Sequence, residues 1–296
     1  MFAAEYRKKH ITAENAARMV KSGDWVDYGF GFSMPWTIDK ALAARKEELR
    51  DVKVRGIMAM RPLAIIAADP GRESFCYMSW HLNAYERALS EKGLCNYIPM
   101  SYHSMPEIYR KCLEIDVAFI TVAPMDTHGC FSFSLANSAT RAILETAKLV
   151  ILEVNERLPR CFGGMDEYVH ISEVDYIVHG EPLDPIAVPA VPVTETDRVI
   201  AGHIVSRMRN GSVIQLGIGS LPNAVGHMIA NSDLKDLGMH TELLGDAYLE
   251  IFRAGKLTNK YKKIDRLKGV WTFSFGSMEL YEWARENPLL ASCPVK

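Results

Sequence analysis

Two segments of this chain repeat one pattern of glycines. The first runs from Lys21 to Pro35 and the second from Arg209 to Pro222; in each, three glycines keep identical spacing and a proline follows at nearly the same place. An amphipathic helix is predicted before each copy, over 12–20 and 197–208. The order of helix, polar glycine turn, strand, G-x-G loop and helix therefore occurs twice. This repetition predicts two related domains of the α/β class.

A proline-rich run at 186–196 has neither a helical nor a strand period, so it is interpreted as the linker between the two domains. We therefore expect an N-terminal domain over 1–190 and a C-terminal domain over 191–296. The second domain is much shorter than the first. It is expected to be either smaller or incomplete.

Local patterns predict the individual elements. Thr12 is the expected N-cap of the first repeat helix, and Thr194 with Asp197 has capping-box spacing at the second. The alternation of strands and helices favours mainly parallel sheets covered by helices. Strands are predicted at 52–58, 117–122, 149–154, 176–178 and 270–275, and further helices at 38–45, 84–91, 139–147 and 279–285.

Composition narrows the class of protein. A formal charge of −2 gives no sign of binding to nucleic acid or to an anionic membrane. None of the six cysteines forms a C-x-x-C pair, and the histidines are dispersed, so neither a disulfide framework nor a zinc site is expected. The N-terminus is too polar for a signal peptide, and no apolar run is long enough to span a bilayer. These features predict a soluble cytoplasmic protein.

The second G-x-G, at Gly217 and Gly219, has three interpretations. It could be a tight turn between strand and helix, for which glycine supplies the backbone freedom. A dinucleotide site, and with it a nicotinamide-dependent oxidoreductase, would need a third glycine where Pro222 stands. The third interpretation is a cradle of backbone N–H groups for an oxyanion or a thioester carbonyl, with Pro222 as the first residue of the following helix.

A carboxylate downstream of this loop could attack a carbonyl held in the cradle. Glu242 stands in the sequence His240-Thr-Glu-Leu, although a glutamate after a short strand is more often a solvated surface group. His240 and Asp246 could be its local neighbours. The loop from Pro124 to Gly129 is better explained as a polar turn than as a wall of an acyl pocket.

The motifs taken together resemble the acetyl-CoA hydrolase/transferase branch of the family I CoA-transferases, within it the butyryl-CoA:acetate and 4-hydroxybutyrate CoA-transferases. The resemblance covers the whole chain. It rests on the segments at 22–29, 122–129, 153–155, 159–160, 170–172, 215–223, 236–242 and 287–290.

The resemblance implies a fold of two similar α/β domains with the active site between them. It makes Glu242 the catalytic nucleophile, and it implies transfer of CoA from a short-chain acyl-CoA to a carboxylate such as acetate by a ping-pong mechanism. Coenzyme A would be a substrate, with no permanently bound cofactor and no metal. The loop that binds CoA and the oxyanion would comprise Gly217, Ile218, Gly219, Ser220 and Leu221.

Two departures from the family pattern qualify these expectations. Ser220 replaces a usual glycine and would be strained if its φ were positive. Family members also continue beyond the end of this sequence, so a C-terminally truncated or split transferase is expected, in which a further polypeptide could complete a homo-oligomeric enzyme. The alternatives are an acyl-CoA hydrolase and a non-catalytic fragment or subunit.

Overall fold

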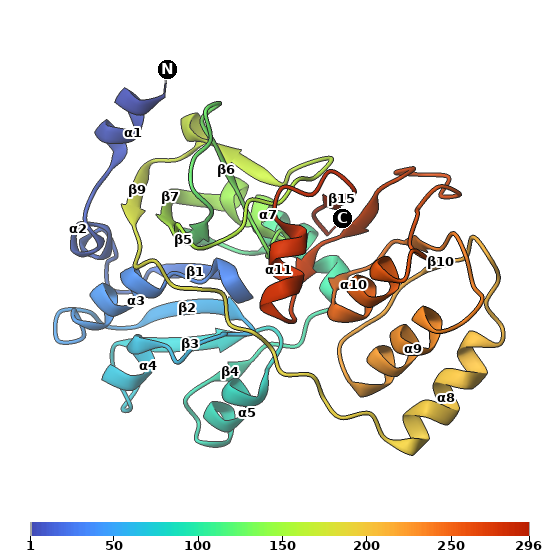
Figure 1. Cartoon of the computed structure of the whole chain (residues 1–296). Coiled ribbons are helices and arrows are strands. Elements are labelled where there is room, and N and C mark those ends of the chain that lie inside the picture. Colours follow the sequence, from blue (N-terminus) through green and yellow to red (C-terminus); the bar gives the residue numbers. More distant parts are fainter. Residues whose placement is uncertain (1, 296) are drawn as a thin grey trace. The chain divides into compact units, whose positions relative to one another are not determined.

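The structure is a computed structural model that describes residues 2–295, and its chain divides into two compact units (Figure 1). The first unit contains residues 2–158, 168–185 and 294–295, and the second contains 159–167 and 186–293. The segment 159–167 joins the second unit because Gly163 forms a parallel bridge with Ser292, whose N–H also donates to the carbonyl of Phe162 at 2.8 Å.

The first unit is built on one sheet of seven strands, all paired in parallel. Its strands are mostly apolar and buried on both faces, as expected for a parallel sheet with helices on either side. The strands lie in the order β4 (Asn96–Tyr97), β3 (Phe75–Ser79), β2 (Val52–Ile57), β1 (Trp25–Phe30), β5 (Ile115–Val122), β7 (Ala147–Val154) and β9 (Tyr176–His179).

Helices connect these strands and cover the sheet. They are α1 (Ala3–Lys9), α2 (Ala13–Arg18), α3 (Trp36–Ala43), α4 (Ala64–Ala68), α5 (Ala84–Glu91), α6 (Met105–Cys112) and α7 (Thr140–Thr146), with short 3₁₀ turns η1 (Gly31–Ser33), η2 (Tyr102–Ser104) and η3 (Ile171–Glu173). A small antiparallel ribbon pairs β6 (Cys130–Ser132) with β8 (Tyr168–His170). The helix and strand predictions for this region are confirmed to within about two residues at each end.

The connections wind the sheet in two directions from β1. The chain crosses through α3 to β2 and through α4 to β3, whereas α7 connects β5 to β7 on the other side of β1. Because parallel crossovers are almost always right-handed, the two directions place these helices on opposite faces. The mainly parallel α/β architecture predicted for this part of the chain is therefore confirmed.

A buried carboxylate anchors the start of α3. Glu153, at the end of β7, is 2% exposed, and its two carboxylate oxygens accept the backbone N–H groups of Trp36, Thr37 and Ile38 at 2.9–3.2 Å. These N–H groups have no partner within the helix, so Glu153 satisfies them and interacts favourably with the helix dipole. This motif residue thus has a structural role in the first unit.

The second unit contains four helices and six short strands. The helices are α8 (Glu195–Val205), α9 (Ser220–Ala230), α10 (Asp246–Arg253) and α11 (Met278–Ala284). The strands form the parallel pairs β10 (Val213–Ile214) with β11 (Gly238–Met239), β12 (Leu243–Leu244) with β14 (Phe273–Ser274), and β13 (Gly269–Trp271) with β15 (Leu290–Ser292).

The internal repeat is confirmed in backbone hydrogen bonding. In the first copy the N–H of Gly23 donates to the carbonyl of Arg50 at 3.0 Å, and the N–H of Arg50 donates to Ser22 Oγ at 2.9 Å. In the second copy Gly211 bonds in the same way to Lys235 at 3.0 Å, and Lys235 returns a bond to the side chain of the residue before the glycine, Asn210, at 2.8 Å. Gly23 and Gly211 also share a left-handed conformation, with φ of +89° and +77°.

Two strand predictions for the second unit are wrong in extent: the strand expected to run into the G-x-G loop at Gly217, and the strand expected at 270–275. The strand before Gly217 covers only Val213–Ile214, because the N–H of Leu216 donates to the hydroxyl of Tyr248 at 2.7 Å instead of to a neighbouring strand. The predicted strand 270–275 is divided at Thr272. There the N–H groups of Thr272 and Phe273 both donate to the carbonyl of Glu242, at 3.0 and 3.2 Å, which interrupts the regular ladder.

Both capping predictions are confirmed. The side chain of Thr12 accepts the N–H of Asn15 at the start of α2, and Thr194 and Asp197 form a reciprocal capping box at α8. All six cysteines are free thiols. Between residues 2 and 295, no group of three or more His, Cys, Asp and Glu side chains is placed to hold a metal ion. The same residues include no helix with the length and hydropathy needed to cross a membrane.

We predict that Gly226→Ala destabilises the second unit. A Cβ at this position would lie 2.5 Å from Ala247 Cβ and 3.0 Å from Ala247 Cα, where α9 packs against α10. Relief of this overlap should cost about 1–3 kcal/mol in the free energy of unfolding, measured by urea denaturation. Gly202→Ala in α8 is the matched control, since its new methyl group meets only Met228 Sδ at 4.0 Å. Its stability should stay unchanged or rise by up to about 1 kcal/mol through helix propensity. Equal losses in the two variants would contradict the prediction.

Candidate functional site

The second copy of the glycine repeat is an open loop at the N-terminus of α9. Gly217 and Ile218 are exposed, with Ile218 58% exposed, and the N-cap Gly219 has φ of +130° and ψ of −178°. Only glycine adopts that conformation readily. Within residues 2–295, no acceptor takes the backbone N–H groups of Gly217, Ile218 or Gly219. The loop therefore presents backbone donors to solvent.

The first copy of the repeat has no such opening. Gly29 and Gly31 are buried, the N–H of Gly29 donates to Asp27 Oδ1 at 2.9 Å, and that of Phe30 donates to Ser33 Oγ at 2.6 Å. A Cβ on Gly29 would lie 2.3 Å from Ser33 Oγ. The two copies share a fold element but not an exposed set of donors, so the repeat alone does not define a site.

Ser220 is accommodated without strain. It is the first residue of α9 and is absent from the residues with positive φ, so its backbone is ordinary. The helix α9 starts at Ser220, two residues before the predicted start at Pro222. Pro222 therefore lies within the first turn, where its missing N–H removes no hydrogen bond. The loop candidates from Gly217 to Leu221 thus form a continuous turn into the helix.

Glu242 stands at an interruption between β11 and β12. Its backbone carbonyl accepts the two N–H groups of Thr272 and Phe273, and this fixes the main chain at that point. Its side chain is exposed. The carboxylate is therefore carried on a firmly hydrogen-bonded backbone while remaining accessible.

Two side chains join the loop to the Glu242 segment. Thr241 Oγ1 lies 3.3 Å from the carbonyl of Leu216, the residue before Gly217, and 3.1 Å from the carbonyl of Leu243. The hydroxyl of Tyr248 accepts the N–H of Leu216 and donates to the carbonyl of Ile214 at 3.2 Å. Burial raises the pKa of Tyr248 to about 12, so this hydroxyl stays neutral. Sequence reasoning did not single out either side chain, because no local pattern indicates their partners.

The neighbouring polar groups have other partners. The carboxylate of Asp246 accepts the N–H of Ser277 at 3.0 Å, next to the start of α11. Burial lowers the pKa of the His240 imidazole, and the nearby positive charge of Lys262 lowers it further. Lys262 itself is buried and donates to the carbonyls of Met239 and Lys268 at 2.8 and 2.7 Å. Asp246 therefore has a structural role close in sequence to Glu242, because it holds the residue that precedes α11.

The loop from Pro124 to Gly129 belongs to the first unit and is a polar turn, as predicted. Asp126 Oδ1 accepts the N–H groups of His128 and Cys130 at 2.8 and 2.9 Å, and Gly129 has φ of +82°. Pro124 and Met125 line a pocket of this unit. The turn is thus held by its own hydrogen bonds.

Comparison with known proteins identifies a matching domain family and two similar enzymes. Residues 2–192 match the acetyl-CoA hydrolase/transferase N-terminal domain. The chain is 46% identical over 296 residues to a butyryl-CoA:acetate CoA-transferase of Anaerostipes caccae, covering 99% of this chain and 66% of that protein. It is also 46% identical over 293 residues to a probable butyrate:acetyl-CoA coenzyme A-transferase of Syntrophomonas wolfei, covering 98% and 65% of the two chains.

A solved structure shares the same fold. RipA from Yersinia pestis superposes with a TM-score of 0.90 at 32% identity, over 99% of this chain and 69% of that one. The chain thus spans slightly less than two thirds of the length of the two curated relatives. Because the domain match covers more than half of the sequence and the identities extend over nearly all of it, this protein belongs to the acetyl-CoA hydrolase/transferase family.

Proposed function

We propose that the protein transfers coenzyme A between a short-chain acyl-CoA, such as butyryl-CoA, and a carboxylate such as acetate. The observation that carries the proposal is the exposed loop at Gly217–Gly219, whose N–H groups have no acceptor among residues 2–295, joined through Leu216 and Thr241 to the segment that carries Glu242. Two relatives that are 46% identical to this chain over the aligned residues are named for CoA transfer between butyrate and acetate.

The chemistry begins with attack by a carboxylate oxygen of Glu242 on the thioester carbonyl. The carbon–sulfur bond breaks, CoA leaves as a thiolate, and an acyl-glutamyl anhydride remains. The thiolate then attacks the glutamyl carbonyl of the anhydride, which releases the first carboxylate and leaves CoA as a thioester on Glu242. Acetate repeats the two steps in reverse and departs as acetyl-CoA. Glu242 ends as a free carboxylate, so no proton is gained or lost.

The loop would stabilise the oxyanion that forms in each of these steps. Backbone N–H groups held before the reaction need no rearrangement as charge develops, and the N-terminus of α9 adds a favourable dipole. Removal of a single such donor typically costs about 3 kcal/mol of barrier stabilisation. Gly219 is the position where a side chain would disturb the loop most, because its φ of +130° excludes other residues.

Hydrolysis of acyl-CoA is the second candidate. The exposure of Glu242 and Gly217 favours it, since anhydride and glutamyl thioester both react with water that reaches them. A third possibility is that the chain binds acyl-CoA but does not catalyse its conversion. The dinucleotide alternative is set aside, because the two relatives that match nearly the whole chain, the G-x-G included, are named as CoA-transferases.

Mass spectrometry of a covalent intermediate tests the proposal. The purified chain is incubated with butyryl-CoA in the absence of acetate, digested, and searched for a CoA thioester on the peptide that contains Glu242. We expect the adduct there, and we expect acetate to discharge it as acetyl-CoA. Loss of the adduct to water at the same rate with and without acetate would favour the hydrolase. A preparation that turns over acyl-CoA without any adduct on Glu242 would refute the assignment.

A further inference from the structure

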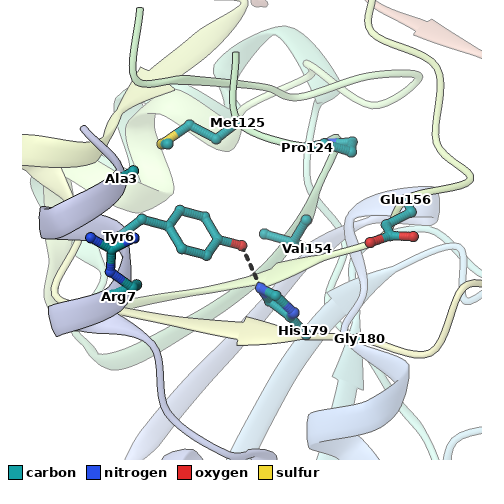
Figure 2. A pocket seen from close by; sticks show the side chains of 9 residues that line it. All are labelled: Ala3, Tyr6, Arg7, Pro124, Met125, Val154, Glu156, His179 and Gly180. Carbon is teal, nitrogen blue, oxygen red and sulfur yellow. Dashed lines mark hydrogen bonds between the residues drawn. The ribbon is translucent and has the colours of Figure 1, made fainter. Parts of the chain in front are cut away.

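The first unit contains a cavity of about 410 Å³ that is lined by none of the residues assigned to the proposed transfer. It lies at the carboxyl ends of three neighbouring parallel strands, β5, β7 and β9, and is covered by α1 (Figure 2). The carboxyl edge of a parallel sheet is where α/β proteins most often bind small molecules. The lining residues are Ala3, Tyr6, Arg7, Pro124, Met125, Val154, Glu156, His179 and Gly180.

A hydrogen-bonded pair of side chains, Tyr6 and His179, lies at the centre of the cavity. The hydroxyl of Tyr6 and Nε2 of His179 are 2.8 Å apart, and the ring of His10 lies 4.5 Å from that of His179 between centroids. Burial, reinforced by the charge of Glu156, raises the pKa of Tyr6 to about 12. Tyr6 therefore keeps its proton and offers a hydroxyl rather than a negative charge.

Two opposite charges flank this pair. Figure 2 shows Arg7, on α1, and Glu156, after β7, on opposite sides of the Tyr6 hydroxyl and His179. Both side chains belong to exposed residues, and neither has an ion pair with any other residue in the range 2–295. On the same helix, by contrast, Lys9 and Glu5 pair with each other at 2.9 Å. One cation and one anion are thus left for a ligand.

Apolar side chains line the cavity between the two charges. Met125 and Pro124 line one wall, and Val154 lies beside the Tyr6 hydroxyl on the side toward Glu156 (Figure 2). A ligand that spans the cavity would place its two ends at Arg7 and Glu156 and its middle against this apolar surface. Charges at the two ends of a short aliphatic chain match that arrangement, whereas a ligand with one charge leaves the opposite residue without a partner.

We propose that this cavity binds an ω-amino carboxylate, a small zwitterion whose carboxylate meets Arg7 and whose ammonium meets Glu156. The planar guanidinium of Arg7 suits a carboxylate in two-point contact. The carboxylate of Glu156 accepts from the ammonium, with the Tyr6 hydroxyl and His179 as further polar partners nearby. The site is in the first unit, and Glu242, in the second unit, does not line it.

The probe is 5-aminopentanoate, titrated into the purified chain and followed by ligand-observed NMR. Three comparison compounds isolate its features: pentanoate lacks the ammonium, pentylamine lacks the carboxylate, and 2-aminopentanoate is an isomer with adjacent charges. We expect 5-aminopentanoate to bind at least about tenfold more tightly than any of the three. No binding, or equal binding of all four compounds, would overturn the proposal.

Variants assign the contacts. Arg7→Gln should weaken the binding of 5-aminopentanoate about tenfold while leaving the affinity for pentylamine unchanged. Glu156→Gln should also weaken the binding of 5-aminopentanoate about tenfold while leaving the affinity for pentanoate unchanged. Lys8→Gln is the control for general charge, since Lys8 is an exposed neighbour on the same helix and does not line the cavity. Equal weakening by Lys8→Gln would show non-specific attraction and overturn the assignment. Glu242→Ala should bind as the wild type does, which separates this site from the transfer chemistry.

Discussion

Replacement of Glu242 by alanine is expected to abolish CoA transfer, with a loss of at least about 10⁴-fold in the rate of acetyl-CoA formation from butyryl-CoA and acetate. The proposed reaction passes through a covalent bond to this carboxylate, and the loss of a nucleophile removes the pathway rather than weakening it. The measurement is the steady-state rate of acetyl-CoA formation, together with the CoA adduct by mass spectrometry. Both should vanish together.

The same substitution should leave the fold intact. Glu242 is exposed, and its backbone carbonyl, which the substitution keeps, accepts the N–H groups of Thr272 and Phe273. Exposed substitutions of this kind usually change the free energy of unfolding by less than about 0.5 kcal/mol. Glu282→Ala is the matched control, an exposed glutamate of the same unit that pairs with Arg285 at 2.9 Å. A Glu242→Ala protein that keeps more than a small part of its rate would exclude the covalent role.

Local rules were enough to predict much of the fold. Thr12 and Thr194 were identified as caps because an N-cap depends only on residues within about four positions along the chain. Both caps are present in the structure. The repeat of Lys21–Pro35 and Arg209–Pro222 also indicated a shared turn, and the structure gives each copy the same hydrogen bonds. Apolar runs such as β5 and β7 were found because a parallel sheet buries both faces of its strands.

Long-range contacts explain what the sequence did not predict. The strand before Gly217 is short because Leu216 bonds to Tyr248, thirty-two positions away, and strand 270–275 is broken by Glu242. Likewise, Glu153 belongs to a recognisable motif, but only the folded chain places it against the N–H groups of α3. In the candidate site, too, local features could be predicted and long-range contacts could not. The sequence indicated the loop and Glu242, whereas Thr241 and Tyr248, which hold them together, appear only in three dimensions.

Asp39→Asn is expected to change the pH dependence of stability in the first unit. Asp39 lies in α3 and is 1% exposed; its carboxylate accepts the hydroxyl of Tyr28 at 3.1 Å and the N–H of Ala64 at 2.5 Å. Burial raises the pKa of this carboxyl from 3.8 to about 7, outweighing these hydrogen bonds, and the nearby Glu153 contributes to the rise. The native protein therefore keeps a proton on Asp39 at pH values where the unfolded chain has lost it.

The sign of the effect follows from that difference in bound protons. Between about pH 4 and pH 7 the native state binds more protons at Asp39 than the unfolded state does, so the free energy of unfolding falls as pH rises through this window. The fall ends once pH exceeds the native pKa. From pH 5 to pH 7 the contribution is about 2 kcal/mol, because the slope of about 1.4 kcal/mol for each pH unit halves as pH reaches the native pKa.

Asparagine removes the titration while preserving the contacts. Its Oδ1 can accept the N–H of Ala64, and its amide can donate to the hydroxyl of Tyr28, so the site remains hydrogen-bonded at every pH. Urea denaturation at pH 5, 6, 7 and 8 should show that Asp39→Asn gains on the wild type by up to about 3 kcal/mol over this range. Asp51→Asn, at an exposed side chain with a left-handed backbone that asparagine tolerates, should leave the wild-type profile unchanged. Parallel pH profiles for Asp39→Asn and the wild type would mean that Asp39 is already ionised in the native state, and would refute the prediction.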